Sequence, residues 1–212
     1  MKRANRLTVV GRTVLLSIAA LLPIDKVEAV DKDTKFKPGP ASSYKGAQTL
    51  EKITIAAVPY HTADLTKTAF GKVNPNTHGI LPVLLVIDNG TGKAIRASDI
   101  VVEFVDLSNR HIESMAASDV VLFDGVQKVP KIPGTGPSPI PLPKRNKNGP
   151  LKTWEIEGRA FAAKLIPPGE SASGFVYFQT SYRDGSKLYL SGLEDAATGQ
   201  EFFYSEVPIE KQ

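Results

Sequence analysis

Short apolar segments separated by turn-forming residues run along most of the chain, a pattern typical of antiparallel β structure. The most apolar of them outside the N-terminal region, residues 80–87, is eight residues long and ends at Asp88-Asn89-Gly90. Its length and its flanking turn favour a strand that is buried on both faces over a helix. Pro82 has no backbone N–H to donate, so we expect it near the start of this strand or at a bulge.

Further strands are predicted where β-branched and aromatic residues alternate with polar ones. In residues 99–107, the face formed by Ile100, Val102 and Phe104 is expected to enter the core, and the alternate positions to face outward. The last two predicted strands are expected to form a hairpin. The other predicted strands are residues 49–60, 111–115, 120–123, 174–180, 187–193 and 201–208.

Residues 62–70 predict a short helix. Thr62 is suited to cap its first turn, and Gly71 is suited to end it. Asp64 falls in the first turn, where a negative charge is favourable beside the positive end of the helix dipole.

Residues 151–166 are ambiguous between helix and strand. Their apolar side chains recur at helical spacing, which favours a short helix, and a strand at residues 154–156 remains the alternative. Trp154 is predicted to pack in the core in either case.

Residues 129–150 contain seven prolines and three glycines, so no ordinary strand or helix can run through them. Because strands are predicted on both sides, we interpret this stretch as a long insertion within one domain. A loop of this length is usually either functional or disordered.

Residues 1–29 have the features of a secretory signal peptide. A basic start precedes a short apolar run at residues 13–23, and Ala29 supplies a small residue for signal peptidase, so cleavage is expected before Val30. The apolar run is well below the roughly 20 residues that span a bilayer, so we expect no stable transmembrane segment after cleavage. The protein is predicted to be exported, periplasmic or extracellular, with residues 30–48 as a flexible lead-in.

Charge and cysteine content narrow the classes of function. Of the 26 basic and 22 acidic residues in the chain, five and two lie in the predicted signal, which leaves a net charge of +1. This balance argues against a nucleic-acid partner. The chain has no cysteine, which excludes disulfides, thiol catalysis, thiolate metal sites and a lipid anchor on cysteine.

One part of the chain carries a family resemblance. Residues 165–178 hold a Pro-Gly-Glu turn before a strand ending in aromatic residues, and residues 187–190 and 80–89 add two further strands. These segments are similar to the telokin-like, immunoglobulin-like domains of small secreted bacterial proteins, most of them without assigned function. The resemblance covers roughly residues 49–209. It implies export and an all-β, immunoglobulin-like β-sandwich over residues 49–212, and it carries no catalytic residues across. The proline-rich insertion and the one or two short helices depart from the simple form of the family.

No segment carries a strong catalytic or metal-binding motif. Ser171 and Ser173 lie among glycines but not in a G-x-S-x-G elbow, so a polar turn is expected there. His61, His78 and His111 lack a metal-binding spacing. We therefore predict no catalytic residues, no cofactor and no metal site.

The acidic residues are expected to be solvated surface charges. Asp99, Glu103 and Asp106 surround one predicted strand, and nothing in the sequence indicates a cleft between them. Glu194 and Asp195 lack the D-x-D-x-D-G pattern of a calcium loop.

Aromatic residues in the C-terminal strands are either core or a stacking platform for sugars or peptide side chains. Alternate aromatics in strands are usually core, which favours the first interpretation. The residues concerned are Phe175, Tyr177, Tyr189, Phe203 and Tyr204.

Lys144, Arg145, Lys147 and Lys152 form a dense basic group after the proline run. An extended, stiffened backbone with these charges is suited to dock an acidic partner or an anionic envelope surface. A solvated loop that serves only solubility is the alternative.

These patterns favour an exported, non-catalytic immunoglobulin-like domain with a binding or structural role in the bacterial cell envelope. Its partner would be an unidentified protein or glycan. Two alternatives remain: a secreted carbohydrate-binding β-sandwich, and an exported enzyme whose site is assembled from scattered residues. An exposed row of aromatic side chains would favour sugar binding, and a pocket with converging acids or histidines would favour an enzyme.

Overall fold

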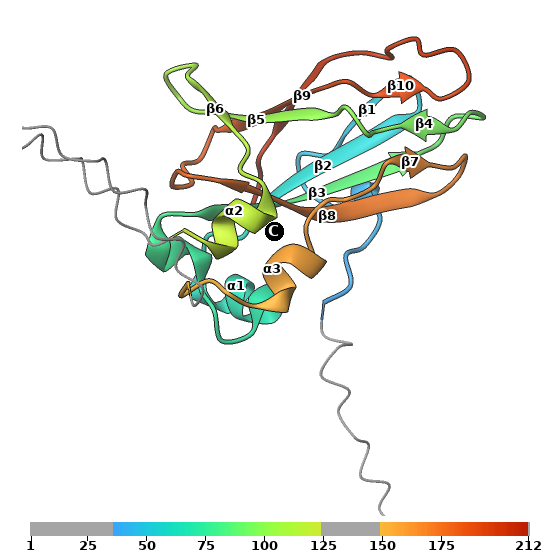
Figure 1. Ribbon diagram of the computed structural model, residues 1–212. Helices are drawn as coiled ribbons and strands as arrows, with labels where there is room; N and C mark the ends of the chain where they lie inside the picture. Colours follow the sequence, from blue (N-terminus) through green and yellow to red (C-terminus); the bar gives the residue numbers. More distant parts are fainter. Residues whose placement is uncertain (1–35, 124–148, 212) are drawn as a thin grey trace, which may run out of the picture. The chain divides into compact units, whose positions relative to one another are not determined.

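The computed structural model describes residues 36–123 and 149–211. Within these residues, eleven strands form three antiparallel sheets, accompanied by a few short helices (Figure 1). The prediction of an all-β protein is therefore confirmed. The predicted signal peptide, residues 1–29, lies outside the described residues, as does most of the predicted proline-rich insertion.

The first sheet has the strand order β1-β2-β3-β8, so β3 lies between two antiparallel neighbours. Every residue of β3 from its start to Ile87 is buried, which confirms the predicted strand with two buried faces. Pro82 is the second residue of β3, near its start as predicted, and its carbonyl accepts a hydrogen bond of 2.9 Å from the Tyr60 N–H. The bounds are β1 Gln48–Leu50, β2 Ile53–Pro59, β3 Leu81–Asn89 and β8 Ser171–Phe178.

The predicted strand at residues 49–60 is in fact a hairpin of two strands, β1 and β2. Its turn consists of Glu51 and Lys52, whose φ angles are 47° and 68°. Two turn residues with positive φ are usually asparagine or glycine. The residue types Glu51 and Lys52 therefore did not indicate a turn.

The second sheet has the order β11-β9-β5-β6, and a small third sheet has the order β10-β4-β7. The antiparallel pairing within the predicted C-terminal hairpin is confirmed, because β11 lies antiparallel to β9. The two strands are not a simple hairpin, however, because β10 lies between them in the chain and pairs with β4. In addition, the first half of the predicted strand 201–208 lies outside β11, and its Glu201 forms only an isolated bridge to Glu194. The bounds are β4 Ile95–Arg96, β5 Val101–Val105, β6 His111–Glu113, β7 Leu165–Ile166, β9 Lys187–Ser191, β10 Glu194–Asp195 and β11 Ser205–Pro208.

The first and second sheets share one hydrophobic core. Val102 and Phe104 are buried in it and Ile100 packs against it, so the predicted inward face of residues 99–107 is confirmed. Val101 on the alternate face is 48% exposed. Alternate residues of β3 and β9 complete the centre of this core: Leu81, Val83, Leu85, Ile87, Leu188 and Leu190.

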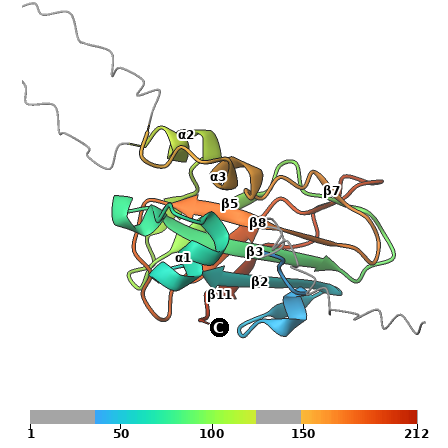
Figure 2. The same ribbon diagram turned by 90° about the horizontal axis from the view of Figure 1, so that it is seen from below.

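The opposite face of the first sheet carries a second core, which the helices cover. Figure 2 views the molecule from this side and shows α1 and α3 in front of the sheet. Leu84, Val86 and Phe175 point into this core, and the Tyr177 hydroxyl donates a buried hydrogen bond of 2.7 Å to the Ile156 carbonyl. The two covered faces explain why β3 is apolar throughout. The helices are α1 Ala63–Phe70, α2 Ala117–Val121 and α3 Trp154–Gly158, with 3-10 helices η1 Ala41–Ser43 and η2 Pro75–His78.

Helix α1 begins and ends as the sequence predicts. The Thr62 side chain accepts a hydrogen bond from the Leu65 N–H at 3.3 Å, Asp64 lies in the first turn, and Gly71 is the C-cap with φ 64°. The positive φ accounts for glycine at this position.

The predicted strand at residues 120–123 is wrong, because this segment belongs largely to α2. The Val120 N–H donates to the Ala116 carbonyl at 3.1 Å, and Val120 and Val121 are both buried in the second core. A run of four apolar residues is too short to show a period, and here packing against the helical side of the first sheet decides the conformation.

Residues 151–166 contain a short helix, as predicted, but α3 occupies only five of these residues and β7 lies at their end. Trp154 was predicted in the core, and this is wrong: it is 59% exposed. It is the first residue of α3, and its ring lies over Gly158, where an added Cβ would come within 2.7 Å of Trp154 Cε3. The Arg159 guanidinium lies 5.4 Å from the centre of the Trp154 ring.

Residues 36–48, part of the predicted lead-in, contact the domain. The Phe36 ring stacks on Phe175 at a centroid distance of 5.1 Å. Ala41 is fully buried, and its N–H donates to Asp88 Oδ2 at 2.7 Å.

The described residues on either side of the proline-rich segment lie against each other. A Cβ on Gly149 would overlap the carbonyl oxygen of Val121. We therefore expect replacement of residues 132–148 by a short Gly/Ser linker to leave the domain folded, because loop length changes closure entropy only slowly. Thermal melting checks this, with a variant carrying a 17-residue Gly/Ser segment as the control for length. A short-linker variant without a cooperative transition would contradict the expectation.

Candidate functional site

Three of the four residues predicted to bind a partner, Lys144, Arg145 and Lys147, lie outside the described residues. Lys152 is exposed and precedes α3. The basic group therefore stays a prediction. The described residues offer a different candidate, which lies on the outer face of the second sheet.

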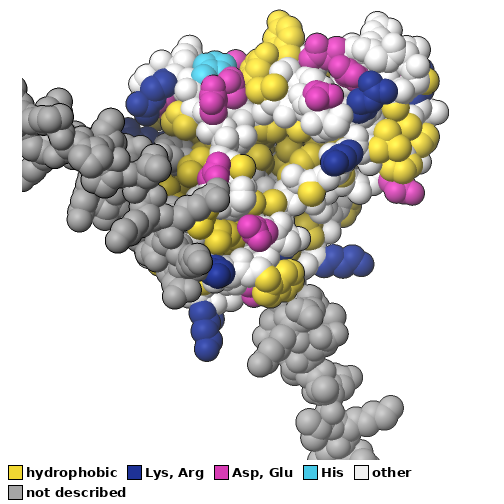
Figure 3. All heavy atoms as spheres, in the orientation of Figure 1, with side chains coloured by type: hydrophobic (Ala, Val, Ile, Leu, Met, Phe, Trp, Pro, Cys, Tyr) yellow, Lys and Arg dark blue, Asp and Glu magenta, His cyan; other side chains and the backbone are white. Residues whose placement is uncertain are grey.

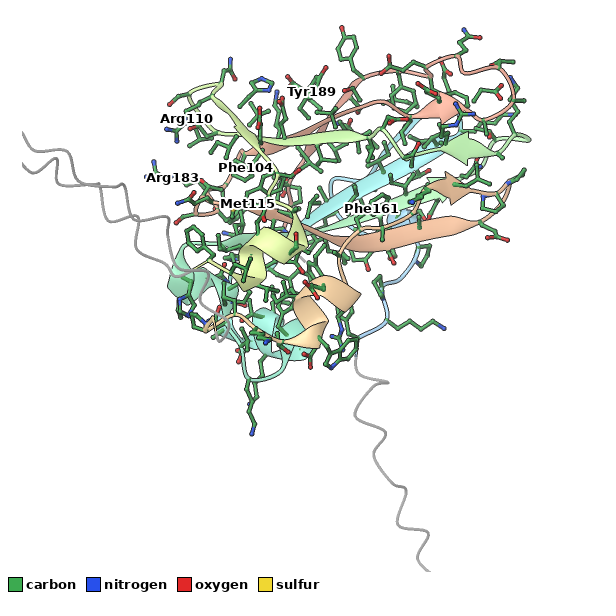
Figure 4. The ribbon with its side chains drawn as sticks, in the orientation of Figure 1. Phe104, Arg110, Met115, Phe161, Arg183 and Tyr189 are labelled. Carbon is green, nitrogen blue, oxygen red and sulfur yellow. The ribbon has the colours of Figure 1, made fainter. Side chains whose placement is uncertain are left out.

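Strand register places a set of aromatic and charged side chains on this outer face. Leu188 and Leu190 enter the core, so Tyr189 between them points outward. Tyr189 lies opposite Glu103 of β5 and Glu206 of β11, and directly opposite residues share a face. Figure 4 shows Tyr189 on the side of the sheet away from Phe104. We call this surface, formed by Tyr189, Tyr204, His111 and Glu103, the tyrosine face.

The aromatic rings of the tyrosine face are close together and accessible. The rings of Tyr189 and Tyr204 are stacked, with centroids 6.2 Å apart and an interplanar angle of 29°. Tyr204 is 73% exposed, more than any other large hydrophobic side chain in the described part of the chain. The His111 ring meets Tyr189 edge-on at 5.5 Å. Such rings combine an apolar body with polar tips, which suits a contact with a partly polar ligand.

Hydrogen-bonding groups surround these rings. His111 Nδ1 lies 2.6 Å from Glu103 Oε2, and Lys187 Nζ donates to Glu206 Oε2 at 2.7 Å. The hydrogen bond from Lys187 lowers the pKa of Glu206, so this carboxylate is ionised and accepts hydrogen bonds at neutral pH. In Figure 3 a histidine appears over β6 beside acidic side chains. Rings for stacking and carboxylates for hydroxyl groups thus lie on one surface.

The aromatic residues of the C-terminal strands separate into two groups. Phe175 and Tyr177 are buried in the second core, and Phe203 is partly buried against the first. Tyr189 and Tyr204 belong to the tyrosine face. The expectation that these aromatics are core is therefore right for the first group and wrong for the tyrosines of β9 and the loop before β11. The alternation of leucine with other residues in residues 187–190 was the sequence signal that places Tyr189 on the outer face.

The other candidate residues do not converge on a catalytic or metal site. Ser171 and Ser173 lie in β8 rather than in a turn. His61 Nδ1 lies 3.2 Å from the Pro59 carbonyl, and His78 ends η2, whereas His111 contacts the second sheet. Within residues 36–123 and 149–211, no group of three or more His, Asp or Glu side chains is placed to hold a metal ion.

The expectation of solvated surface charge is wrong for Asp195, which is buried, and both Glu194 and Asp195 form ion pairs. Asp195 accepts from Lys93 Nζ at 2.6 Å, and Glu194 pairs with Arg96 at 3.1 Å. The hydrogen bond from Lys93 is the main cause of a lowered pKa of Asp195. These two carboxylates of β10 therefore bind the basic side chains of Lys93, in the turn after β3, and of Arg96 in β4. Both ion pairs hold β10 to β4 and the turn before it.

Two further findings concern membrane spanning and similarity to known proteins. In the described part of the chain, no helix has both the length and the apolar character needed to cross a bilayer. The chain matches no family model, and no curated protein matches it. Its function must therefore be argued from its own side chains.

Proposed function

We propose that this chain is an exported, non-catalytic immunoglobulin-like domain that binds a carbohydrate of the bacterial cell envelope on the tyrosine face. The observation that carries the proposal is the stacked pair of half-buried Tyr189 and exposed Tyr204 on an outer sheet surface with Glu103 and His111 beside it. Sugar rings present C–H faces that pack on aromatic rings and hydroxyl groups that donate to carboxylates. A sheet surface with both features fits that chemistry.

The immunoglobulin-like assignment draws on two sheets that share one core, together with the resemblance of residues 165–178 to secreted bacterial domains. Export draws on the basic and apolar pattern of residues 1–29. A periplasmic or extracellular place would bring the tyrosine face into contact with envelope glycans. A protein partner is the alternative ligand for the same surface.

Replacement of Tyr204 by alanine tests the proposal. We expect it to weaken binding to a polysaccharide ligand about tenfold, which corresponds to the loss of roughly 1.4 kcal/mol of stacking energy. The ligand is found by affinity electrophoresis of the protein against a panel of envelope and extracellular polysaccharides, and the affinity is then measured by calorimetry. Tyr189→Ala should have a similar effect.

Trp154→Ala is the matched control, because Trp154 is also an exposed aromatic side chain but lies on α3. It should bind as the unmodified protein does. The proposal is wrong if no polysaccharide in the panel binds, or if the Tyr204 and Trp154 variants bind equally well.

A further inference from the structure

A cavity of about 470 Å³ lies at one end of the second sheet. Its walls come from the turn between β5 and β6 and from the loop between β8 and β9. Figure 4 shows Arg110 and Arg183 projecting at this same end of the molecule. The polar side chains that line it are those of Asp106, Arg110, Arg183, Ser108, Thr180, Ser181 and Ser186.

Arg110 is held in place by Asp106. Arg110 Nε donates to Asp106 Oδ2 at 3.1 Å, and one Nη lies 3.0 Å from the same oxygen. Asp106 Oδ1 accepts the backbone N–H groups of Ser108 and Arg110 at 2.8 Å and 3.0 Å. These hydrogen bonds, that from the Arg110 N–H first, lower the pKa of Asp106. Its carboxylate is therefore ionised, and both of its oxygens already accept hydrogen bonds. The remaining Nη donors of Arg110 stay available.

Arg183 supplies a second guanidinium without a competing carboxylate. No hydrogen bond or ion pair joins its side chain to any other residue in the described part of the chain. The neighbouring Asp184 is occupied instead by Lys211 and by the Tyr182 hydroxyl. With two arginines and one carboxylate, the lining carries a formal charge of +1.

Ser186 lines the cavity and carries one of three buried side-chain oxygens that have no hydrogen-bond partner among the described residues. The residue is 2% exposed. A buried hydroxyl left without a partner costs about 1–3 kcal/mol, so native structures rarely leave one without a reason. Rotation of this side chain toward the cavity would let a bound ligand supply that partner.

We propose that this cavity binds a phosphate group. Guanidinium groups bind oxyanions through paired N–H donors, and here two of them come from different loops. Hydroxyl side chains from both walls add donors in further directions, which suits a tetrahedral group better than a planar carboxylate. The inference is independent of the tyrosine face, because none of the residues of that face lines the cavity.

Calorimetric titration of the folded protein with inorganic phosphate tests the inference, at constant ionic strength maintained with chloride. We expect saturable binding that falls more than tenfold in Arg183→Gln and is partly retained in Arg183→Lys. Lys72→Gln, which removes one exposed positive charge away from the cavity, should bind as the unmodified protein does. Tyr204→Ala should also leave phosphate binding unchanged, even where it abolishes polysaccharide binding.

Two further probes identify the source of the phosphate. Glucose 6-phosphate, with glucose as its control, represents a phosphorylated sugar, and phosphatidylglycerol vesicles represent a lipid headgroup. Binding of any of the three phosphate probes that depends on Arg183 supports the inference. It is overturned if none of the three binds, or if Arg183→Gln and Lys72→Gln lose affinity equally, since that result indicates non-specific attraction to net charge.

Discussion

Replacing Leu85 by aspartate is expected to abolish the cooperative unfolding transition of the domain. Leu85 is fully buried in the middle of β3, between Ala57 of β2 and Gly174 of β8. A carboxylate at this position would have no cationic partner within the first core and would cost several kcal/mol to bury. The free energy of unfolding of a domain of this size is only about 5–15 kcal/mol, so this single change removes most of it. Circular dichroism during thermal melting measures the effect.

Leu50→Asp provides the matched control in the same sheet. Leu50 lies on the edge strand β1 and is 40% exposed, so the same chemical change there leaves the new charge in water. Its effect on the free energy of unfolding should stay within about 0.5 kcal/mol, as for most surface substitutions. Similar melting curves for the two variants would show that β3 is not the centre of the fold.

The position of β3 could be predicted because its signals are local. Eight apolar residues followed by Asp88-Asn89-Gly90 indicate both the approximate length of the strand and where it ends. Burial on both faces also follows from the sequence, because a strand with one solvent-exposed face alternates between apolar and polar residues. The structure shows which elements pack against the two faces of β3: the second sheet on one side and the helices on the other.

The errors occur where tertiary packing decides. Val120 and Val121 favour a strand by residue type, yet they are buried as part of a helix beside α3. Trp154 is apolar and large, but its place in the first turn of a five-residue helix leaves it in solvent. Neither outcome is encoded in a short sequence window, because each depends on segments that are distant along the chain.

The candidate sites show the same division. Tyr189 could be assigned to an outer face once Leu188 and Leu190 were assigned to the core, so part of the tyrosine face was predictable. The phosphate cavity was not, because Arg110 and Arg183 belong to separate loops and share no motif. Only the antiparallel pairing of β5 with β9 brings those loops to one end of the sheet.

Asn89→Asp is expected to destabilise the domain strongly although it changes no side-chain volume. Asn89 is buried at the end of β3, and its amide Nδ2 donates to the carbonyls of Lys93, Ile166 and Pro167 at 2.8, 2.9 and 3.0 Å. An aspartate would place a negatively charged oxygen against these three carbonyl oxygens. The Lys93 and Pro167 carbonyls keep hydrogen bonds from the Thr91 hydroxyl and the Glu170 N–H, whereas the Ile166 carbonyl loses this donor. Burying the new charge against carbonyl oxygens adds to that loss, so a total loss of about 3 kcal/mol is expected in urea unfolding at pH 7.

The pH dependence of this variant identifies the cause. Burial and the facing carbonyls favour the protonated carboxyl, so the introduced group should have a raised pKa in the folded state. Its protonated form regains one O–H donor, and the deficit relative to the unmodified protein should therefore shrink as the pH falls below the folded-state pKa and grow as the pH rises through it. Asn109→Asp, the same change in an exposed turn, should show neither the loss nor its pH dependence. A deficit that is the same at pH 4 and pH 8 would mean that the Asn89 amide does not hold the end of β3 to β7 by these donors.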